Sequence, residues 1–277
     1  PNELYSVEKK MQIISEVYHT LKDVLVRKYG KIAKRKSDRE DSKLIPLYKL
    51  LSVEHLLKKP FLNDGNTLNK NFYTELLHLI GLEETKVGTK KLIERKKEDA
   101  RNSGSLLELA IALITSRGKL YELDNPHHFG KTADEQTSNV ALELVITWIN
   151  RILFLKLLEA QLIKYHKGDK SFAFLNIEKI KTFSELDALF FQVLAVRNGE
   201  RDASVSKEFA NVPYLNSSLF EQTSLESATV TVTHLSDGAK LPILSNTVLK
   251  DELGVKKSGE LGTLSYLFEF LNAYDFT

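Results

Sequence analysis

The sequence predicts a mainly α-helical protein in which several helices pack around one long buried central helix, with a small β-hairpin near the C-terminus. Three observations lead to this fold class. Apolar residues recur at helical spacing over most of the first two-thirds of the chain. The stretch 132–166 is apolar on nearly all its faces, which is typical of a helix covered on several sides. Only after about Val212 does a segment alternate between apolar and polar residues, as a half-buried strand does.

Length and composition favour a globular protein. The 277 residues are enough for one large domain or two smaller ones with a buried core. Hydrophobic residues make up 42% and charged residues 27% of the chain, a balance typical of folded proteins rather than disordered ones. The absence of cysteine excludes a disulfide framework and thiolate metal sites, and it fits a reducing compartment, so we expect a cytoplasmic protein. Because the net charge is only +2, a nucleic-acid-binding face must come from local clustering of cations.

The N-terminal quarter of the chain predicts a helix followed by short segments. Apolar residues at helical spacing run from Val7 to Leu25, and Gly30 ends this helix. The next segments are, in order, a polar loop of mixed charge, two short helices and a turn: 31–43, 45–51, 52–60 and 61–67. The chain begins at Pro1 without a methionine or a signal peptide, so we expect it to be part of a longer polypeptide.

Three further helices are predicted on either side of the central one. The segment 69–81 has helical spacing and ends at Gly81, and 105–118 has the same pattern and ends at Gly118. A third helix is expected over 184–196, where SELDALFFQVLAV is largely apolar.

The central helix carries its own start and stop signals. Thr132 and Glu135 form the pattern of a capping box, and Gly168 marks the end. Trp148 lies in the middle of the apolar run, so we expect it to be buried in the core. The helix should be the pillar around which the others pack.

Charged residues inside this apolar run exclude a membrane span. The stretch 140–163 contains Glu143, Arg151 and Glu159, and such charges are costly in a bilayer. A buried arginine needs a partner, because burying an unpaired charge destabilises the fold by roughly several kcal/mol. We therefore expect Arg151 to form a structural ion pair with Glu143, with Glu159 or with a carboxylate on another helix.

The C-terminal part predicts the hairpin and a last helix. TVTVTHL at 229–235 alternates like a strand, Ser236-Asp237-Gly238 is typical of a turn, and 241–249 is the expected partner strand. The segment 260–274 returns to a helical pattern. We expect two domains: a helical connector over 1–211, and a hairpin with a helix over 212–277.

Asn211-Val212-Pro213-Tyr214 matches three positions of the Asn/Asp-Pro-Pro-Tyr loop of adenine methyltransferases. That loop needs a proline at the second position, a preceding strand, and a glycine-rich cofactor loop earlier in the same sheet. Position 212 is valine, the preceding SVSKEFA is helix-like, and no glycine-rich loop follows a predicted strand upstream. The tetrapeptide is therefore not predicted to be catalytic.

The surroundings of this tetrapeptide resemble a known family. VPYLNSSLFE, preceded by NVALELVITWINRILFLKLLEAQLI and followed by GELGTLSYLFEFLNAYDF, resembles the helical region before the methyltransferase in type IIG restriction–modification enzymes. LIPLYKLLSVEHLLKKPF and SELDALFFQVLA extend the resemblance to about residues 40–277. In those enzymes an endonuclease, a helical region, a gamma-class adenine methyltransferase and a target-recognition region share one polypeptide.

The resemblance implies partners and cofactors for the whole enzyme. The partners would be double-stranded DNA and the endonuclease and methyltransferase domains of the same polypeptide, with no membrane. S-adenosylmethionine and Mg²⁺ would serve the whole enzyme, whose catalytic motifs would lie before Pro1 and after Thr277. Within this chain the resemblance implies no catalytic residue, no cofactor and no metal.

Two clusters of cations could contact DNA phosphates. The first runs from Arg27 to Lys36, and the second lies in ETKVGTKKLIERKKEDAR at 84–101. Both contain interleaved carboxylates, so each could equally be an ordinary solvated surface. The second is favoured because Gly88 and its polar neighbours suggest an exposed loop. Its candidate backbone-binding residues are Lys90, Lys91, Arg95, Lys96 and Lys97.

No other motif predicts chemistry. His127 and His128 follow Asn125-Pro126, but adjacent histidines rarely face one metal ion, and a surface turn is expected. The functional expectation is a non-catalytic connector that spaces the two enzymatic domains and touches DNA phosphates without reading bases. The alternative is a helical protein–protein interaction module without DNA contact.

Overall fold

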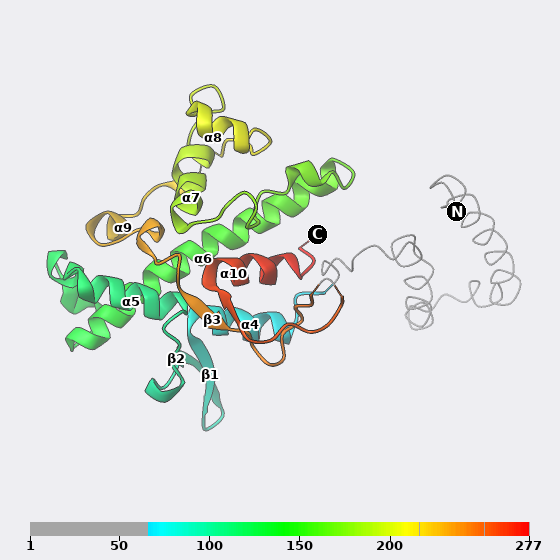
Figure 1. Ribbon diagram of the computed structural model, residues 1–277. Coiled ribbons are helices and arrows are strands. Elements are labelled where there is room, and N and C mark those ends of the chain that lie inside the picture. The colour runs from blue at the N-terminus through cyan, green and yellow to red at the C-terminus, as the bar shows by residue number, and fades with distance from the viewer. Residues whose placement is uncertain (1–65, 216, 252, 277) are drawn as a thin grey trace, which may run out of the picture. The chain divides into compact units, whose positions relative to one another are not determined.

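The structure is a computed structural model, which describes residues 66–215, 217–251 and 253–276 (Figure 1). The predicted helix over 7–25, the segments at 31–60, most of the turn at 61–67 and the first basic cluster lie outside these residues. The described part confirms the predicted class: a mainly helical fold with two small antiparallel two-stranded sheets. In chain order the α-helices and strands are α4 (Lys70–Ile80), β1 (Leu82–Val87), β2 (Lys90–Arg95), α5 (Leu106–Ser116), α6 (Ala133–Tyr165), α7 (Phe183–Ala188), α8 (Ala203–Glu208), α9 (Ser224–Ala228), β3 (Lys240–Pro242), β4 (Glu260–Gly262) and α10 (Thr263–Asn272).

The long helix α6 begins and ends as predicted. The Thr132 hydroxyl accepts a hydrogen bond from the Glu135 amide, and the Glu135 carboxylate accepts from the Thr132 amide, so the capping box is formed. At the other end Gly168, with φ 88°, donates its amide hydrogen to the Ile163 carbonyl. Trp148 is buried, with 1% of its surface exposed, which confirms its predicted place in the core.

Arg151 forms the predicted buried ion pair, and its partner is a carboxylate on another element. Its guanidinium contacts both oxygens of Glu226 on α9, at 2.9 Å for Nη2 to Oε2, and it also donates to the carbonyls of Leu219 and Glu221. The indole of Trp148 donates to the same carboxylate at 2.9 Å. Burial would raise the pKa of Glu226, but these donors and the Arg151 charge outweigh it and lower the pKa. The pair joins α6 to α9.

One side of α6 is not covered by the described residues. Ile146, Phe154 and Leu157 are 39%, 41% and 46% exposed, and they lie along one stripe with the exposed Asn150. The expectation that an all-round apolar helix is covered on several sides therefore holds for most of α6 but not for this stripe. We call Ile146, Phe154 and Leu157 the α6 stripe.

Helices α4, α5, α7 and α10 lie in segments that the sequence predicts to be helical, although Glu260–Gly262, the start of the predicted 260–274, form strand β4. Gly81 ends α4 with φ 104°, and Gly118 follows α5 with φ 64°. Helix α7 continues into a π-helical turn at Leu189–Leu194, so the two together cover 184–194 of the predicted 184–196. Helices α4 and α10 pack against each other through stacked rings of Phe72 and Phe270, 4.9 Å apart.

A C-terminal hairpin forms, but its strands are not the ones that the sequence predicts. Residues 229–235 are not a strand: Val232–His234 form a 3₁₀ turn, while Val230 and Val232 are buried. Local hydrogen bonds compete with strand formation, because the Thr229 hydroxyl donates to the Leu225 carbonyl and the Thr231 amide to the His234 ring. The hairpin that does form pairs β3 with β4, with Leu241 opposite Leu261. Of the predicted partner strand 241–249, only its first two residues lie in β3.

The second sheet, β1–β2, lies where the sequence suggests only an exposed basic loop. Charged residues dominate both strands, and β2 is exposed at five of its six residues, so no alternation of apolar and polar residues marks a strand here. The described residues of Leu62–Asp251 and Val255–Thr277 form one compact unit, which contains the domain boundary predicted between 211 and 212.

Candidate nucleic-acid interface

The five predicted phosphate-binding residues lie on or just after the hairpin β1–β2. The hairpin leaves the end of α4 at Gly81, where a side chain would meet the Ser105 hydroxyl at 2.6 Å. Its strands pair from Leu82 opposite Arg95 to Val87 opposite Lys90, and Gly88 forms the turn with φ 63°. Figure 1 shows the ribbon extending away from the helices.

The Arg95 side chain binds other residues of the protein rather than facing solvent. Its guanidinium binds Glu108 of α5 as a fork, with Nε to Oε1 at 2.7 Å and Nη2 to Oε2 at 2.6 Å. A third hydrogen bond joins Nη1 to the Ser138 hydroxyl of α6 at 2.9 Å. Two-point binding of this kind fixes orientation as well as distance. Arg95 therefore anchors the base of the hairpin to two helices.

Lys96 forms a second anchor. Its ammonium lies 2.9 Å from Nδ1 of His78, and Nε2 of His78 lies 2.8 Å from the Pro242 carbonyl oxygen. A carbonyl only accepts, so Nε2 carries the hydrogen and Nδ1 accepts from Lys96. Burial lowers the pKa of Lys96. Burial also lowers the pKa of His78, against the opposing hydrogen bond to Pro242 and with a further contribution from the Lys96 charge. The Lys96 amide also donates to the Gly81 carbonyl at 3.3 Å.

The end of the hairpin away from the helices is exposed and cationic. We call residues 85–92 the hairpin tip. The tip contains Lys86, Lys90 and Lys91, all exposed, and no carboxylate. Lys91 contacts Glu84, just outside the tip, at 2.8 Å across the ribbon. The Glu84 carboxyl has a lowered pKa because of this lysine.

The five predicted phosphate-binding residues therefore fall into two groups. Lys90, Lys91 and Lys97 face solvent, whereas Arg95 and Lys96 point to partners within the protein. The inward partners lie 13 to 43 residues away from Arg95, so no local pattern in the sequence could reveal them. Lys86 joins Lys90 and Lys91 because it lies opposite Lys91 in the register.

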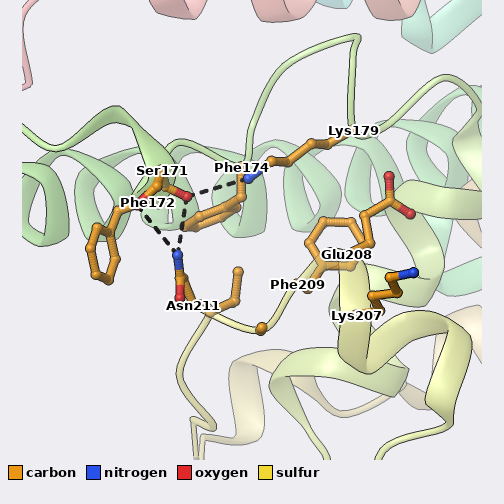
Figure 2. A pocket seen from close by; sticks show the side chains of 10 residues that line it. Ser171, Phe172, Phe174, Lys179, Lys207, Glu208, Phe209 and Asn211 are labelled. Atoms are coloured by element: carbon orange, nitrogen blue, oxygen red, sulfur yellow. Dashed lines mark hydrogen bonds between the residues drawn. The ribbon is translucent and has the colours of Figure 1, made fainter.

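The tetrapeptide at 211–214 lies after a helix, not after a strand. Helix α8 ends at Glu208, Val212 is buried, and Arg201 donates to the Val212 carbonyl at 2.9 Å. Figure 2 shows the pocket beside it, which Asn211 lines with its amide donating to the Ser171 carbonyl at 3.4 Å. The Asn211 amide is thus used within the protein, and the strand context of a methyltransferase loop is missing at this position.

Comparison with known families covers nearly the whole chain. Residues 65–277 match the family described as domain of unknown function DUF7814. The chain belongs to the DUF7814 family. Residues 3–64 match a second domain of unknown function, DUF7149. No curated protein and no solved structure matches the chain.

The two adjacent histidines of the DUF7814 domain lie on its surface. His127 and His128 lie on an exposed 3₁₀ turn at Pro126–Phe129, as the sequence predicts, and His128 contacts the Asn125 side chain at 3.1 Å. Within the described ranges, histidines and carboxylates nowhere gather in a group of three that could hold a metal ion. Among the described helices, none is both long and apolar enough to cross a membrane.

Proposed function

We propose that this chain is part of a type IIG restriction–modification enzyme, in which the DUF7814 domain is a non-catalytic connector that contacts the DNA backbone. The single observation that carries the DNA contact is the hairpin tip: Lys86, Lys90 and Lys91 are exposed on a projecting ribbon without a carboxylate among them. The enzyme family itself is supported by the resemblance of the segments around VPYLNSSLFE. S-adenosylmethionine and Mg²⁺ would serve the catalytic domains of the whole enzyme.

The anchors at the base of the hairpin suit a spacing role. Arg95 and Lys96 tie the ribbon to α4, α5 and α6, so its cations are held at a fixed position relative to the helices. A duplex that lies against the tip would then be held at a defined position relative to the endonuclease and methyltransferase domains. Phosphate contacts of this kind set register and carry no base sequence.

The test is fluorescence anisotropy of the full chain with labelled duplex across a salt series. Changing Lys86, Lys90 and Lys91 to Gln together should weaken binding equally on two unrelated duplexes. The slope of log affinity against log salt should fall by about 0.9 for each phosphate that the variant no longer neutralises, from an affinity on the order of 10⁻⁴–10⁻⁶ M near physiological salt.

A matched control removes the same charge elsewhere. Lys164, Lys167 and Lys170 lie near the end of α6, away from the hairpin, and their change to Gln should leave affinity and slope nearly unchanged. If the tip variant and this control behave alike, the tip is an ordinary solvated surface. A changed preference between the two duplexes would mean that the tip reads bases.

The second candidate is a protein–protein interaction module without DNA contact. The α6 stripe supports it, because Ile146, Phe154 and Leu157 expose apolar side chains that a partner protein could cover. Retention on heparin separates the two candidates. Retention that collapses with salt supports the DNA contact, whereas no retention, or retention insensitive to salt, supports the protein–protein module.

A further inference from the structure

The hairpin tip is a projecting ribbon, whereas contact with one row of phosphates requires only a flat surface. It is a two-stranded ribbon with side chains exposed on both faces, and a side chain at Gly88 would meet open space. Isolated two-stranded sheets are at best marginally stable in water. The anchors of Arg95 and Lys96 therefore maintain a ribbon that the helices do not otherwise cover.

Cations lie on both faces of this ribbon. Successive residues of a strand point to opposite faces, so Lys86 and Lys91, which face each other in the register, share one face, and Lys90 lies on the other. The carboxylates of the hairpin are set back toward its base, at Glu83, Glu84 and Glu94. A surface that lies against one row of phosphates would need its cations on one face only. Cations on both faces fit a site with phosphates on both sides.

Such a site is a groove of duplex DNA. The major groove is about 12 Å wide and 8.5 Å deep and admits a two-stranded ribbon, whereas the minor groove is only about 6 Å wide. Three residues of each strand, 85–87 and 90–92, span roughly 10 Å at about 3.3 Å per residue. This length slightly exceeds the depth of the major groove, so residues 85 and 92 lie at its mouth. Glu84, which contacts Lys91 at 2.8 Å, lies just beyond them.

We infer that the hairpin tip enters the major groove, with Lys90 toward one phosphate strand and Lys86 and Lys91 toward the other. The inference rests on the proposed DNA contact and adds which surface of the duplex is met.

The test uses the full wild-type chain and chemically altered DNA. Two duplexes of one sequence are compared by anisotropy at low salt, one plain and one with every cytosine converted to glucosylated 5-hydroxymethylcytosine. The sugar fills the major groove and leaves the phosphate charge unchanged. We expect the sugar to weaken binding at least about tenfold, or ~1.4 kcal/mol. Distamycin, which occupies the minor groove of an A·T-rich duplex, should change the affinity little.

Two single lysine variants serve as a further check on the groove contact. Lys86→Gln and Lys90→Gln should each weaken binding to plain DNA and should matter much less on the glucosylated duplex. Equal affinity for both duplexes, with binding still sensitive to salt and to these lysines, would overturn the groove inference and keep the backbone contact. Competition by distamycin alone would move the tip to the minor groove and overturn the inference. Binding of neither duplex would overturn the proposed function and the inference together.

Discussion

Trp148 contributes both a large apolar ring and a polar hydrogen to the core. Its ring is 1% exposed and its indole donates to Glu226, which also holds Arg151. Trp148→Ala should lower the free energy of unfolding by roughly 3–5 kcal/mol, the range for deleting a large buried aromatic side chain. Chemical denaturation checks this value.

The same helix offers a control, and the protein offers a direct optical check. Leu157→Ala, on the α6 stripe, should cost much less, because the side chain is 46% exposed. Trp148 is the only tryptophan, so the emission maximum of the native protein reports on it alone and should be blue-shifted. Emission typical of solvent-exposed tryptophan would contradict the buried position.

His78 should make stability depend on pH. Its pKa is lowered by burial first and by the Lys96 charge, so the neutral form is favoured in the folded state. The stability that it contributes is therefore fully present above the unfolded pKa of about 6.5 and is lost as pH falls through the lower folded pKa. Protonation of Nδ1 of His78 would also place an N–H hydrogen against the Lys96 ammonium, which already donates to this nitrogen.

The measurement compares unfolding free energies between pH 7.5 and 5. The slope that His78 adds lies between the two pKa values and has an upper limit of about 1.4 kcal/mol per pH unit. His78→Gln should flatten the curve in this window, whereas His128→Gln, on an exposed turn, should leave it as in the wild type. Parallel curves for the wild type and His78→Gln would rule out this role.

Among the elements, the hairpin β1–β2 depends most on side chains outside itself. Arg95 binds Glu108 and Ser138, and these contacts connect the ribbon to α5 and α6. Arg95→Gln removes the charged fork, so the hairpin should open more often while the rest of the fold stays intact. Amide hydrogen exchange over 82–95 should become at least about tenfold faster, which corresponds to ~1.4 kcal/mol of local stability.

The reference for this prediction lies within the same protein. Amides in the middle of α6 should keep their wild-type exchange rates, because they do not depend on the hairpin. Lys97→Gln removes a neighbouring exposed charge and should leave the hairpin protected. Unchanged exchange over 82–95 in Arg95→Gln would show that strand pairing alone holds the ribbon.

At the scale of the whole molecule, the proposed connector role predicts that this chain has no methyltransferase activity. Position 212 is valine and its loop follows α8, and the Asn211 amide is used by Ser171. Calorimetry with S-adenosylmethionine should show no saturable binding, and tritium transfer to DNA should stay at the blank level. A bona fide adenine methyltransferase serves as the positive control in both assays. Binding or transfer would overturn the connector proposal.

Local chemistry along the chain determined where helices begin, end and become buried. The capping box of Thr132 and Glu135, the left-handed Gly81 and the buried Trp148 all depend on residues within a few positions of each other, so the sequence predicts them correctly. The mainly helical class follows from the same signals. Composition and spacing also located the cationic segment that forms the hairpin.

Tertiary structure decided which distant groups meet. Sequence shows that Arg151 needs a carboxylate, but only the path of the chain brings Glu226, 75 residues later, to it. The same holds for β3 and β4, which pair across an intervening loop while the Val/Thr alternation at 229–235 becomes a turn. Arg95 and Lys96 carry the same charge as Lys90, yet Glu108 and His78 draw them inward. Contacts between distant residues depend on how all the elements pack, and a local pattern of residue types does not contain that information.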